Sequence, residues 1–345
     1  NVLDDRAMRE EVEMKRPIEA LAVSVAATLA LAGAVTADGH ARVVIPFDME
    51  AGEVAEGVAV DEWGNVFTAI SGQGRFLRLP RGEDEAQSLV EVTGLAEGDF
   101  GVTGLAFNGD DDQYYYALYG AVVSSNPELN GIVFVDPGAK FESDFEWRHI
   151  NGTQRMGMAN GIAFNEEGEH MYVSDSAAGA IWRLPLFGFV GYDQPEVWIA
   201  DPLLEGTGEL PLPFPVGANG VAVRDGVVYV GVTEQMHVVG IPILADDQPG
   251  EPFVYAELPG VAADGIAFDS DGNLYVADPP MHTLWKVTPE GEMSAVADVD
   301  DGLSGPSSVA LWENDDGLVA YVSNQAIGNP ETIKHGPSIV EVTLE

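Results

Sequence analysis

The sequence predicts an all-β protein, a β-propeller of six four-stranded blades closed by an N-terminal strand in the last blade. Three observations lead to this fold. One phrase recurs six times, its equivalent positions lie 43 to 59 residues apart, and no helical period appears after residue 41. That spacing is too long for a leucine-rich or hexapeptide solenoid, and it matches a propeller blade of four strands. We therefore expect one domain over residues 42–345.

The repeated phrase has the pattern of a β-hairpin. Each copy begins with a strand of small and apolar residues, passes through a polar turn that contains Gly, and ends in a strand rich in β-branched and aromatic residues. Alternation and turn chemistry of this kind favour a hairpin. The small residues of the first strand fit the crowded position nearest a propeller axis. In chain order the copies span 55–71, 102–120, 159–176, 218–234, 263–279 and 306–324.

Two further strands complete each blade. After the fifth hairpin come TLWKVTP (283–289) and SAVADV (294–299). The sixth hairpin is followed only by SIVEVTL (338–344), whereas ARVVIPFD (41–48) precedes the first blade without a partner. Pairing these two strands would close the ring and remove open sheet edges. The Pro-rich insert 201–217 is expected to be a loop over one face.

Residues 14–41 have the design of a secretory signal peptide. A basic start at Lys15 and Arg16 precedes an apolar stretch at 21–34, and small residues follow. The stretch is short for a membrane span of ~20 residues. We expect the mature chain to lack a membrane span and to be periplasmic or secreted. Residues 1–13 are interpreted as an over-extended leader.

The chain is strongly acidic, with 57 Asp and Glu against 15 Lys and Arg and a formal net charge of -42. Such a charge repels phosphates and anionic membranes, so nucleic-acid binding is excluded as a function class. An acidic surface suits a salty environment, because counter-ions screen its self-repulsion, and halotolerance is expected. High charge also keeps an exported protein soluble. Export would permit disulfide bonds, but the chain has no Cys. The fold must therefore be stabilised by packing, alone or together with a bound metal.

One position of the repeat carries most of the polar chemistry. At the start of each inner strand, in order, stand Glu56, Thr103, Asn160, Asn219, Asp264 and Ser307, and Gly follows all but the last. Because the inner strands share a direction, these residues should meet at one end of the central tunnel. Carboxylates brought together in a dry channel need a proton or a cation, and an all-oxygen set without His or Cys suits Ca²⁺ better than Mg²⁺. The competing interpretation is that Asn-Gly and Asp-Gly are ordinary turn dipeptides.

The six-phrase pattern resembles the gluconolactonase and senescence-marker-protein (regucalcin) family. Its donor order is even more similar to that of the related paraoxonase and squid-type diisopropylfluorophosphatase propellers. The resemblance implies a calcium-dependent hydrolase of lactones, esters or organophosphates, with Glu56, Asn160, Asn219 and Asp264 as calcium ligands and Asp264 also helping to activate water. The sequence departs from the paraoxonase pattern at Gly265, where that branch carries a further Asn ligand, and in having no Cys. Strictosidine-synthase-like proteins share the architecture without the metal, so fold alone does not decide activity.

Further catalytic candidates follow from the ends of the second strands, which return to the same face. There we expect Ser71, Tyr119, Asp175, Glu234, Asp278 and Asn324. Asp264 is the first candidate for the general base, and Asp175 and Glu234 are alternative bases or substrate contacts, in competition with a role as solvated loop acids. His282, four residues after Asp278, is a candidate for proton transfer in competition with an ordinary surface His.

Two hypotheses from different classes follow. The first is an exported Ca²⁺-dependent hydrolase that acts on a lactone or ester by metal-assisted attack of water, with phosphotriesters as a further substrate class. The second is a non-catalytic propeller that binds a ligand or partner and uses the ion structurally. Under the first hypothesis we expect a monomer whose partner is a small-molecule substrate.

Overall fold

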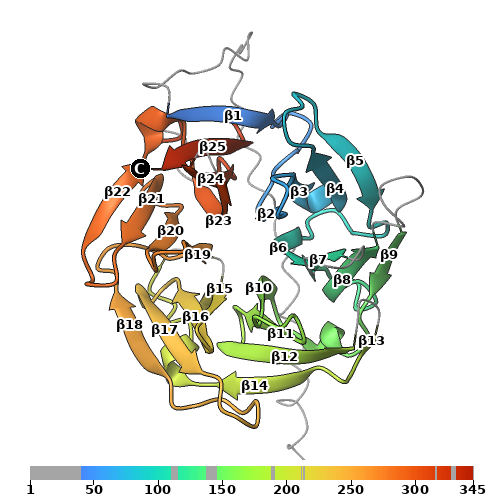
Figure 1. Ribbon diagram of the computed structural model, residues 1–345. Helices are drawn as coiled ribbons and strands as arrows, with labels where there is room; N and C mark the ends of the chain where they lie inside the picture. Colours follow the sequence, from blue (N-terminus) through green and yellow to red (C-terminus); the bar gives the residue numbers. More distant parts are fainter. Residues whose placement is uncertain are drawn as a thin grey trace, which may run out of the picture. The chain divides into compact units, whose positions relative to one another are not determined.

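The computed structural model describes residues 40–109, 116–136, 146–187, 191–210, 212, 214–314, 317–327 and 332–344. Six antiparallel sheets of these residues are arranged as a ring, which confirms the predicted six-bladed propeller (Figure 1). Among the described residues the only helical segments are single 3₁₀ turns, namely η1 (Ser71–Gln73), η3 (Thr153–Arg155), η4 (Pro202–Leu204) and η5 (Val299–Asp301). Apart from His40 and Ala41, the leader and signal peptide lie outside the described residues, so both stay predictions.

The first three blades run in chain order from the inner to the outer strand. Blade 1 comprises β2 (Val58–Val60), β3 (Val66–Ile70), β4 (Arg75–Leu79) and β5 (Gln87–Glu91). Blade 2 comprises β6 (Gly101–Gly109), β7 (Tyr116–Val123), β8 (Gly131–Asp136) and β9 (Glu146–His149). Blade 3 comprises β10 (Ala159–Phe164), β11 (His170–Asp175), β12 (Ala180–Phe187) and β14 (Glu196–Ala200), with the short β13 (Gly191–Tyr192) against the end of β12.

Blades 4 and 5 repeat this order, and blade 6 closes the ring. Blade 4 comprises β15 (Ala218–Arg224), β16 (Val227–Val232), β17 (His237–Pro242) and β18 (Phe253–Glu257). Blade 5 comprises β19 (Ile266–Phe268), β20 (Leu274–Asp278), β21 (Thr283–Val287) and β22 (Met293–Ala297). Blade 6 comprises β23 (Pro306–Asn314), β24 (Gly317–Asn324), β25 (Ser338–Leu344) and β1 (Ala41–Pro46).

The predicted closure is confirmed by the pairing of β1 with β25. The two strands are antiparallel from Ala41 opposite Val342 to Pro46 opposite Ser338. A bidentate ion pair between Arg42 and Glu341, with Nε 2.7 Å from Oε1, reinforces the seam at the surface. The first and last segments of the domain therefore share one blade, and this shared blade closes the ring.

The hydrophobic core consists of six clusters, one at each contact between neighbouring blades. Every inner strand carries an apolar residue, an Ala and a second apolar residue in succession, such as Ile162-Ala163-Phe164 in β10. Ile162 and Phe164 pack against blade 2 in one cluster with Ala106 and Tyr119. Inner-strand side chains of one blade thus fill the space against the neighbouring blade near the axis.

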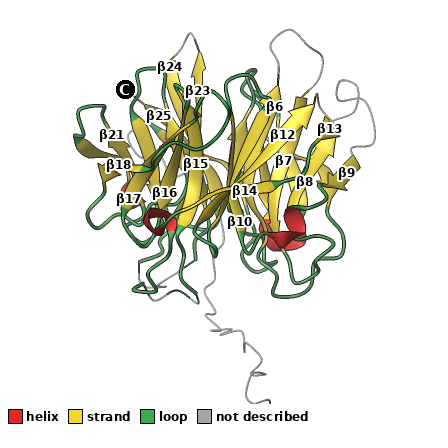
Figure 2. Cartoon of the chain, turned by 90° about the horizontal axis from the view of Figure 1, so that it is seen from below, coloured by secondary structure: helices red, strands yellow, loops and turns green. Residues whose placement is uncertain are grey.

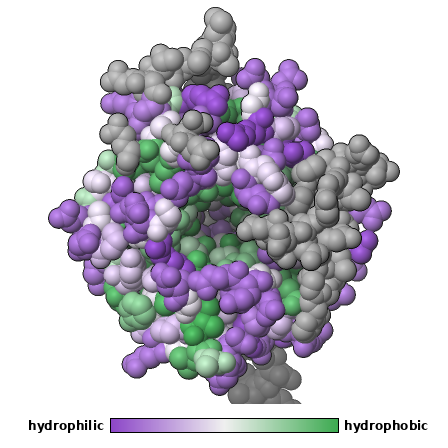
Figure 3. Space-filling model, in the orientation of Figure 1, coloured by the Kyte–Doolittle hydropathy of each residue, from purple (hydrophilic) through white to green (hydrophobic). Residues whose placement is uncertain are grey.

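We call the end of the ring at which the inner strands begin the proximal face. It lies at the lower edge of Figure 2, where the 3₁₀ turns are drawn in red. Loops that lead into the inner strands lie on this face, and the insert 201–217 is one of them. The described residues of this insert form a loop except for η4. Figure 3 looks down the ring axis and shows a hollow at its centre. None of the described helical turns has the length and apolar character needed to cross a membrane.

Candidate active site

In blades 2 to 6 the residues at the start of the inner strands lie in β-bulges. In blade 3 the pairing of β10 with β11 skips one position, so Asn160 and Gly161 lie together opposite Ser174. The same shift occurs between β6 and β7, β15 and β16, and β23 and β24. Bulges re-aim a side chain relative to the regular strand and are common next to active sites. The interpretation of these dipeptides as turns is therefore wrong.

Blade 5 has the same arrangement around Asp264. The Asp264 N–H donates to the carbonyl of Ala277 at 3.0 Å, and the Ala277 N–H donates to the carbonyl of Gly265 at 2.9 Å. Two residues of the inner strand thus face one residue of its partner. The chain therefore bulges at Asp264, directly before β19.

The Gly after each of these residues is required by crowding between blades. A Cβ on Gly161 would lie 2.5 Å from the carbonyl oxygen of Asn219, and a Cβ on Gly220 would lie 2.3 Å from that of Asp264. Real Cβ contacts are essentially never this short. The dipeptide pattern therefore records a close approach of neighbouring inner strands and not a left-handed backbone.

The four predicted ligands converge on one small cavity on the axis. A space of about 80 Å³ is lined by Glu56, Asn160, Asn219 and Asp264 together with neighbouring backbone. The two Asn side chains are buried, and the two carboxylates are half-buried because they face the cavity. The structure thus brings together the oxygen donors that the repeat placed in register, and their role as ligands stays a prediction.

The two carboxylates oppose one another electrostatically. Burial raises the pKa of Asp264 to about 8, against a smaller lowering by the Asn219 side chain, and the nearby Asp278 raises it further. Burial and the charge of Asp264 raise the pKa of Glu56 well above its usual value, and Asn160 offsets this in part. Two carboxylates in a shared dry site cannot both ionise at low cost unless a cation neutralises them.

The donor set fits a hard cation such as Ca²⁺. The Asn219 Nδ2 donates to Thr233 Oγ1 at 3.0 Å, which leaves Asn219 Oδ1 as a buried oxygen without a hydrogen-bond partner. All four side chains offer oxygen, which calcium prefers. No group of three or more His, Cys, Asp and Glu able to hold a metal occurs in the described part of the chain. The candidate set is consistent with that finding, because only two of its four members are acids and the other two are amides.

A belt of hydroxyl groups holds the backbone around this cavity. Thr103 Oγ1 donates to the Ala159 carbonyl at 2.8 Å, and Thr233 Oγ1 donates to the Ala263 carbonyl at 2.8 Å. Ser307 Oγ donates to the Glu56 carbonyl at 2.8 Å, and the Ser174 hydroxyl donates to the carbonyl of Asn219. Each bond joins one blade to the next beside a predicted ligand. Sequence reasoning missed this role because Ser and Thr carry no such signal outside their three-dimensional context.

Asp175 occupies the last position of β11 and is fully hydrogen-bonded. Its Oδ2 accepts from Gly157 N at 2.7 Å and from Trp182 Nε1 at 3.3 Å, and its Oδ1 accepts from Met158 N at 2.9 Å and Ala178 N at 3.2 Å. These contacts fix the segment that leads into Asn160. They describe a positioning residue, and they give no support to the prediction that Asp175 is a general base.

Asp278 occupies the equivalent place in blade 5. Its Oδ2 accepts from Trp285 Nε1 at 3.1 Å and its Oδ1 accepts from Ala262 N at 3.3 Å, two residues before Asp264. Burial raises the pKa of Asp278 to about 6, and the indole and backbone donors offset part of the rise. Asp278 therefore positions the approach to Asp264 and adds negative charge beside it.

Glu234 anchors the insert 201–217 on the proximal face. One oxygen, Oε2, accepts from Gly208 N and from Thr207 Oγ1, the latter at 3.4 Å. The other, Oε1, is buried and has no hydrogen-bond partner. By strand pairing Glu234 lies two residues beyond the position that Asp175 occupies in blade 3.

His282 is buried between blades 5 and 6. Its Nδ1 accepts from Gly305 N at 2.9 Å, so the ring proton resides on Nε2, which is buried without a partner. Burial and the charge of Lys334 lower the pKa of His282, which favours its neutral form. The side chain therefore accepts a hydrogen bond from the backbone of blade 6, and its candidate role in proton transfer stays a prediction.

Of the remaining candidates for the ends of the second strands, two lie there and one does not. Ser71 starts η1 directly after β3, and the Asn324 side chain accepts from Ser304 N at 3.0 Å. Tyr119 is different: it pairs with Ala106 in the middle of β7 and is buried in the core. The expectation that Tyr119 ends the strand is wrong because β7 continues to Val123.

Comparison with known proteins identifies the fold. No protein-family model matches the chain. No curated protein matches it either. A gluconolactonase structure from Xanthomonas campestris is similar, with 15% identity, a TM-score of 0.58, and coverage of 88% of this chain and 89% of that one. The chain has the fold of such propellers.

Two further solved structures share this fold. The calcium-binding protein regucalcin from Agrobacterium tumefaciens has 14% identity and a TM-score of 0.55 over 87% of this chain and 95% of that one. The PQQ-bound aldose sugar dehydrogenase from Streptomyces coelicolor has 16% identity and a TM-score of 0.55 over 88% and 97%. These likenesses confirm the predicted propeller architecture. Because the names cover different activities, the fold by itself does not choose among them.

Proposed function

We propose that this protein is a calcium-dependent hydrolase that opens a lactone or ester by attack of water at the proximal end of the ring. One observation carries the proposal. Glu56 and Asp264 converge with two Asn side chains on a single small cavity, where burial and a neighbouring carboxylate raise the pKa of each acid. A rigid, water-poor set of oxygen donors that requires a cation is the arrangement that a catalytic metal needs.

The residues would divide the chemistry as follows. Glu56, Asn160, Asn219 and Asp264 would hold Ca²⁺, which when bound supplies positive charge to stabilise the oxyanion that forms as water adds to the carbonyl group. Asp264 is the candidate to accept the proton of the attacking water, because its carboxylate faces the cavity. Thr233 holds the Asn219 amide in place, and Asp278 fixes the backbone that leads to Asp264.

The cellular setting belongs to the same proposal. The signal-peptide pattern at 14–41 supports export to the periplasm or the exterior, and the net charge of -42 supports function in a salty medium. The partner would be a small neutral molecule that enters from the proximal face. We expect the protein to act as a monomer.

The test combines metal analysis with a substrate panel. Elemental analysis of purified protein should find calcium, and a chelator should abolish hydrolysis of lactones, aryl esters or phosphotriesters until calcium is restored. Glu56→Gln and Asp264→Asn should each lower kcat/KM by at least about 100-fold. Glu290→Gln, an exposed acid in the β21–β22 turn, is the matched control and should leave activity unchanged.

The outcomes separate the two hypotheses. Bound calcium with no activity on the panel, and no effect of the two variants beyond stability, would favour the non-catalytic propeller with a structural ion. Folded protein without calcium that is still active would remove the metal from the proposal.

A further inference from the structure

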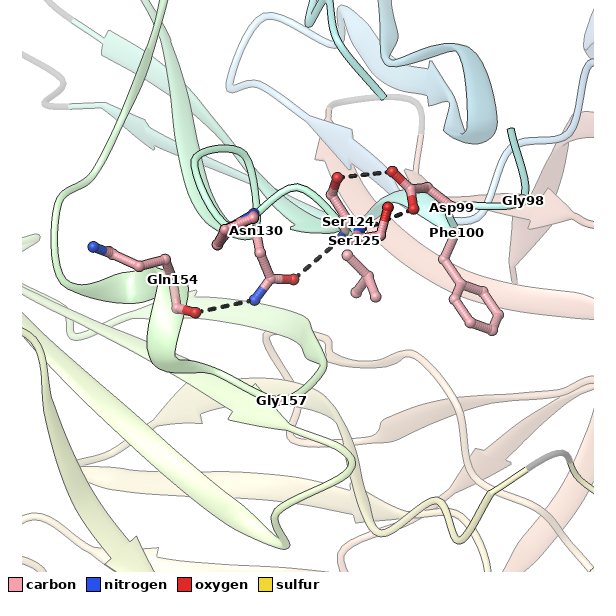
Figure 4. A pocket seen from close by; sticks show the side chains of 10 residues that line it. Gly98, Asp99, Phe100, Ser124, Ser125, Asn130, Gln154 and Gly157 are labelled. Atoms are coloured by element: carbon pink, nitrogen blue, oxygen red, sulfur yellow. Dashed lines mark hydrogen bonds between the residues drawn. The ribbon is translucent and has the colours of Figure 1, made fainter. Parts of the chain in front are cut away.

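A second cavity lies on the proximal face beside the ring (Figure 4). It has a volume of about 310 Å³, and its walls come from the loop before β6, the end of β7 with the loop after it, and the segment before β10. Phe100 lies three residues before Thr103, and Gly157 lies three residues before Asn160. The cavity therefore opens on the same face as the candidate ion site. The chemistry proposed above does not use it.

The wall of this cavity is held by a network of hydrogen bonds. The Asn130 Oδ1 accepts from Ser124 N at 3.2 Å, and Asn130 Nδ2 donates to the Met156 carbonyl at 2.8 Å and to the Gln154 carbonyl at 3.4 Å. One buried amide thus joins blade 2 to blade 3. Such a closed network preorganises the cavity before a ligand arrives.

Asp99 places an ionised carboxylate in this wall. Partial burial favours a raised pKa, but hydrogen bonds from Ser125 N, Ala96 N and the Ser124 hydroxyl together hold the pKa of Asp99 below its usual value. The Ser124 Oγ lies 2.7 Å from Oδ2, as Figure 4 shows, and Ser125 N lies 2.9 Å from Oδ1. None of the described residues that line the cavity is Lys, Arg or His. The negative charge of Asp99 is therefore not neutralised within the cavity.

Phe100 adds an exposed aromatic surface next to that charge. Its side chain is 51% exposed, which is unusual for Phe. Its ring meets the Phe214 ring edge to face, with centroids 5.9 Å apart and an interplanar angle of 85°. The pair joins the loops that lead into blades 2 and 4. An aromatic face beside an uncompensated carboxylate attracts organic cations through its quadrupole and through charge.

We propose that this cavity, with Asp99 and Phe100 as its recognition groups, binds a substituted-ammonium group and rejects a carboxylate of the same size. The proposal rests on the proposed function in one respect: the bound group would be the part of the substrate that is not hydrolysed. The volume accommodates a trimethylammonium or small aryl-ammonium group, and the carboxylate and the ring supply the attraction.

The first test measures binding without turnover. Phenyltrimethylammonium and benzoate are titrated into the full protein by calorimetry at about 0.15 M salt, where exposed charges are screened within a Debye length of roughly 8 Å. We expect phenyltrimethylammonium to bind and benzoate not to bind. Asp99→Asn should weaken the cation by about tenfold and Phe100→Leu by about threefold, consistent with charge and cation–π contributions of about that size.

Glu128→Gln is the matched control, because Glu128 is an exposed acid in the β7–β8 loop, which forms part of the wall, and does not itself line the cavity. It should leave cation binding within twofold. Equal losses in Asp99→Asn and Glu128→Gln would show that only the overall negative charge attracts the cation, and would overturn the proposal. If Asp99→Asn fails to fold, Phe100→Leu decides, since it removes no hydrogen bond.

The second test connects the cavity to hydrolysis. Aryl acetates with trimethylammonium, tert-butyl and carboxylate substituents are compared by kcat/KM. We expect the cation-to-anion ratio to fall about tenfold in Asp99→Asn with the tert-butyl ester unchanged. Cation binding without any hydrolysis would leave this site standing and reject the proposed hydrolase. Hydrolysis with an unchanged cation-to-anion ratio in Asp99→Asn would reject this site and leave the proposed hydrolase standing.

Discussion

Thr233 links the side chain of Asn219 to the backbone of the next blade. Asn219 Nδ2 donates to Thr233 Oγ1 at 3.0 Å, and that hydroxyl donates to the Ala263 carbonyl at 2.8 Å, one residue before Asp264. One buried hydroxyl thus orients a predicted ligand of blade 4 and the chain beside a predicted ligand of blade 5. Outer contacts of this kind tune metal affinity.

Thr233→Val is expected to weaken calcium binding by about 10-fold to 100-fold, because the Asn219 amide loses the contact that aims its oxygen at the cavity. Stability should fall by only about 1 kcal/mol. Calorimetric titration of chelated protein measures the affinity. Thr68→Val is the control: Thr68 is also buried and donates to the Gly57 carbonyl, and its hydroxyl bonds to backbone instead of a predicted ligand side chain. Equal affinity losses in both variants would contradict the role assigned to Thr233.

The calcium-free protein is expected to lose stability as pH rises. The pKa of Asp264 increases from 3.8 to about 8 in the fold, so the folded state retains a proton that the unfolded chain releases. The free energy of unfolding is therefore highest below about pH 4 with respect to this group and decreases as pH rises toward about 8. Thermal unfolding in chelator across this range measures the trend. Added calcium, or Glu56→Gln combined with Asp264→Asn, should flatten it.

Asp175→Asn and Asp175→Ala are expected to behave differently. The Asn variant retains an oxygen acceptor for part of the network, whereas the Ala variant leaves the N–H groups of Gly157, Met158 and Ala178 without their partner and should cost about 2–4 kcal/mol. Activity of the Asn variant should stay within about tenfold of wild type. A loss of 1,000-fold at unchanged melting temperature would instead make Asp175 a catalytic base.

Gly161→Ala is expected to destabilise the protein by about 1–3 kcal/mol, because the added methyl group would lie 2.5 Å from the Asn219 carbonyl oxygen. Calcium affinity should fall with it, since blades 3 and 4 must separate at the ring. Gly336→Ala is the control, as a Cβ there meets nothing within 4 Å. Denaturant unfolding of the two variants provides the comparison, and a harmless Gly161→Ala would reject the crowding argument.

Several features could be predicted from the chain alone, because aligning the copies of a repeat shows which positions are structurally equivalent. Aligning six hairpins placed Glu56, Asn160, Asn219 and Asp264 at equivalent points, and identical strand direction required them to meet on the axis. The sixth blade likewise lacked a fourth strand, and the unpaired segment 41–48 was predicted to supply it. β1 pairs with β25 in that position. Periodic signals of this kind are local, so they survive without knowledge of the fold.

Tertiary structure decided the rest, for a physical reason. Whether Asn-Gly is a turn or a bulge depends on what lies opposite it, and the close approach that demands Gly161 comes from Asn219 in another blade. Likewise, Asp175 and Glu234 look alike in sequence, but four donors saturate the first and the second leaves one oxygen unpaired. The sequence by itself determined the propeller and the set of oxygen donors. The contacts between blades, which join residues far apart in the chain, determined what each polar group holds in place.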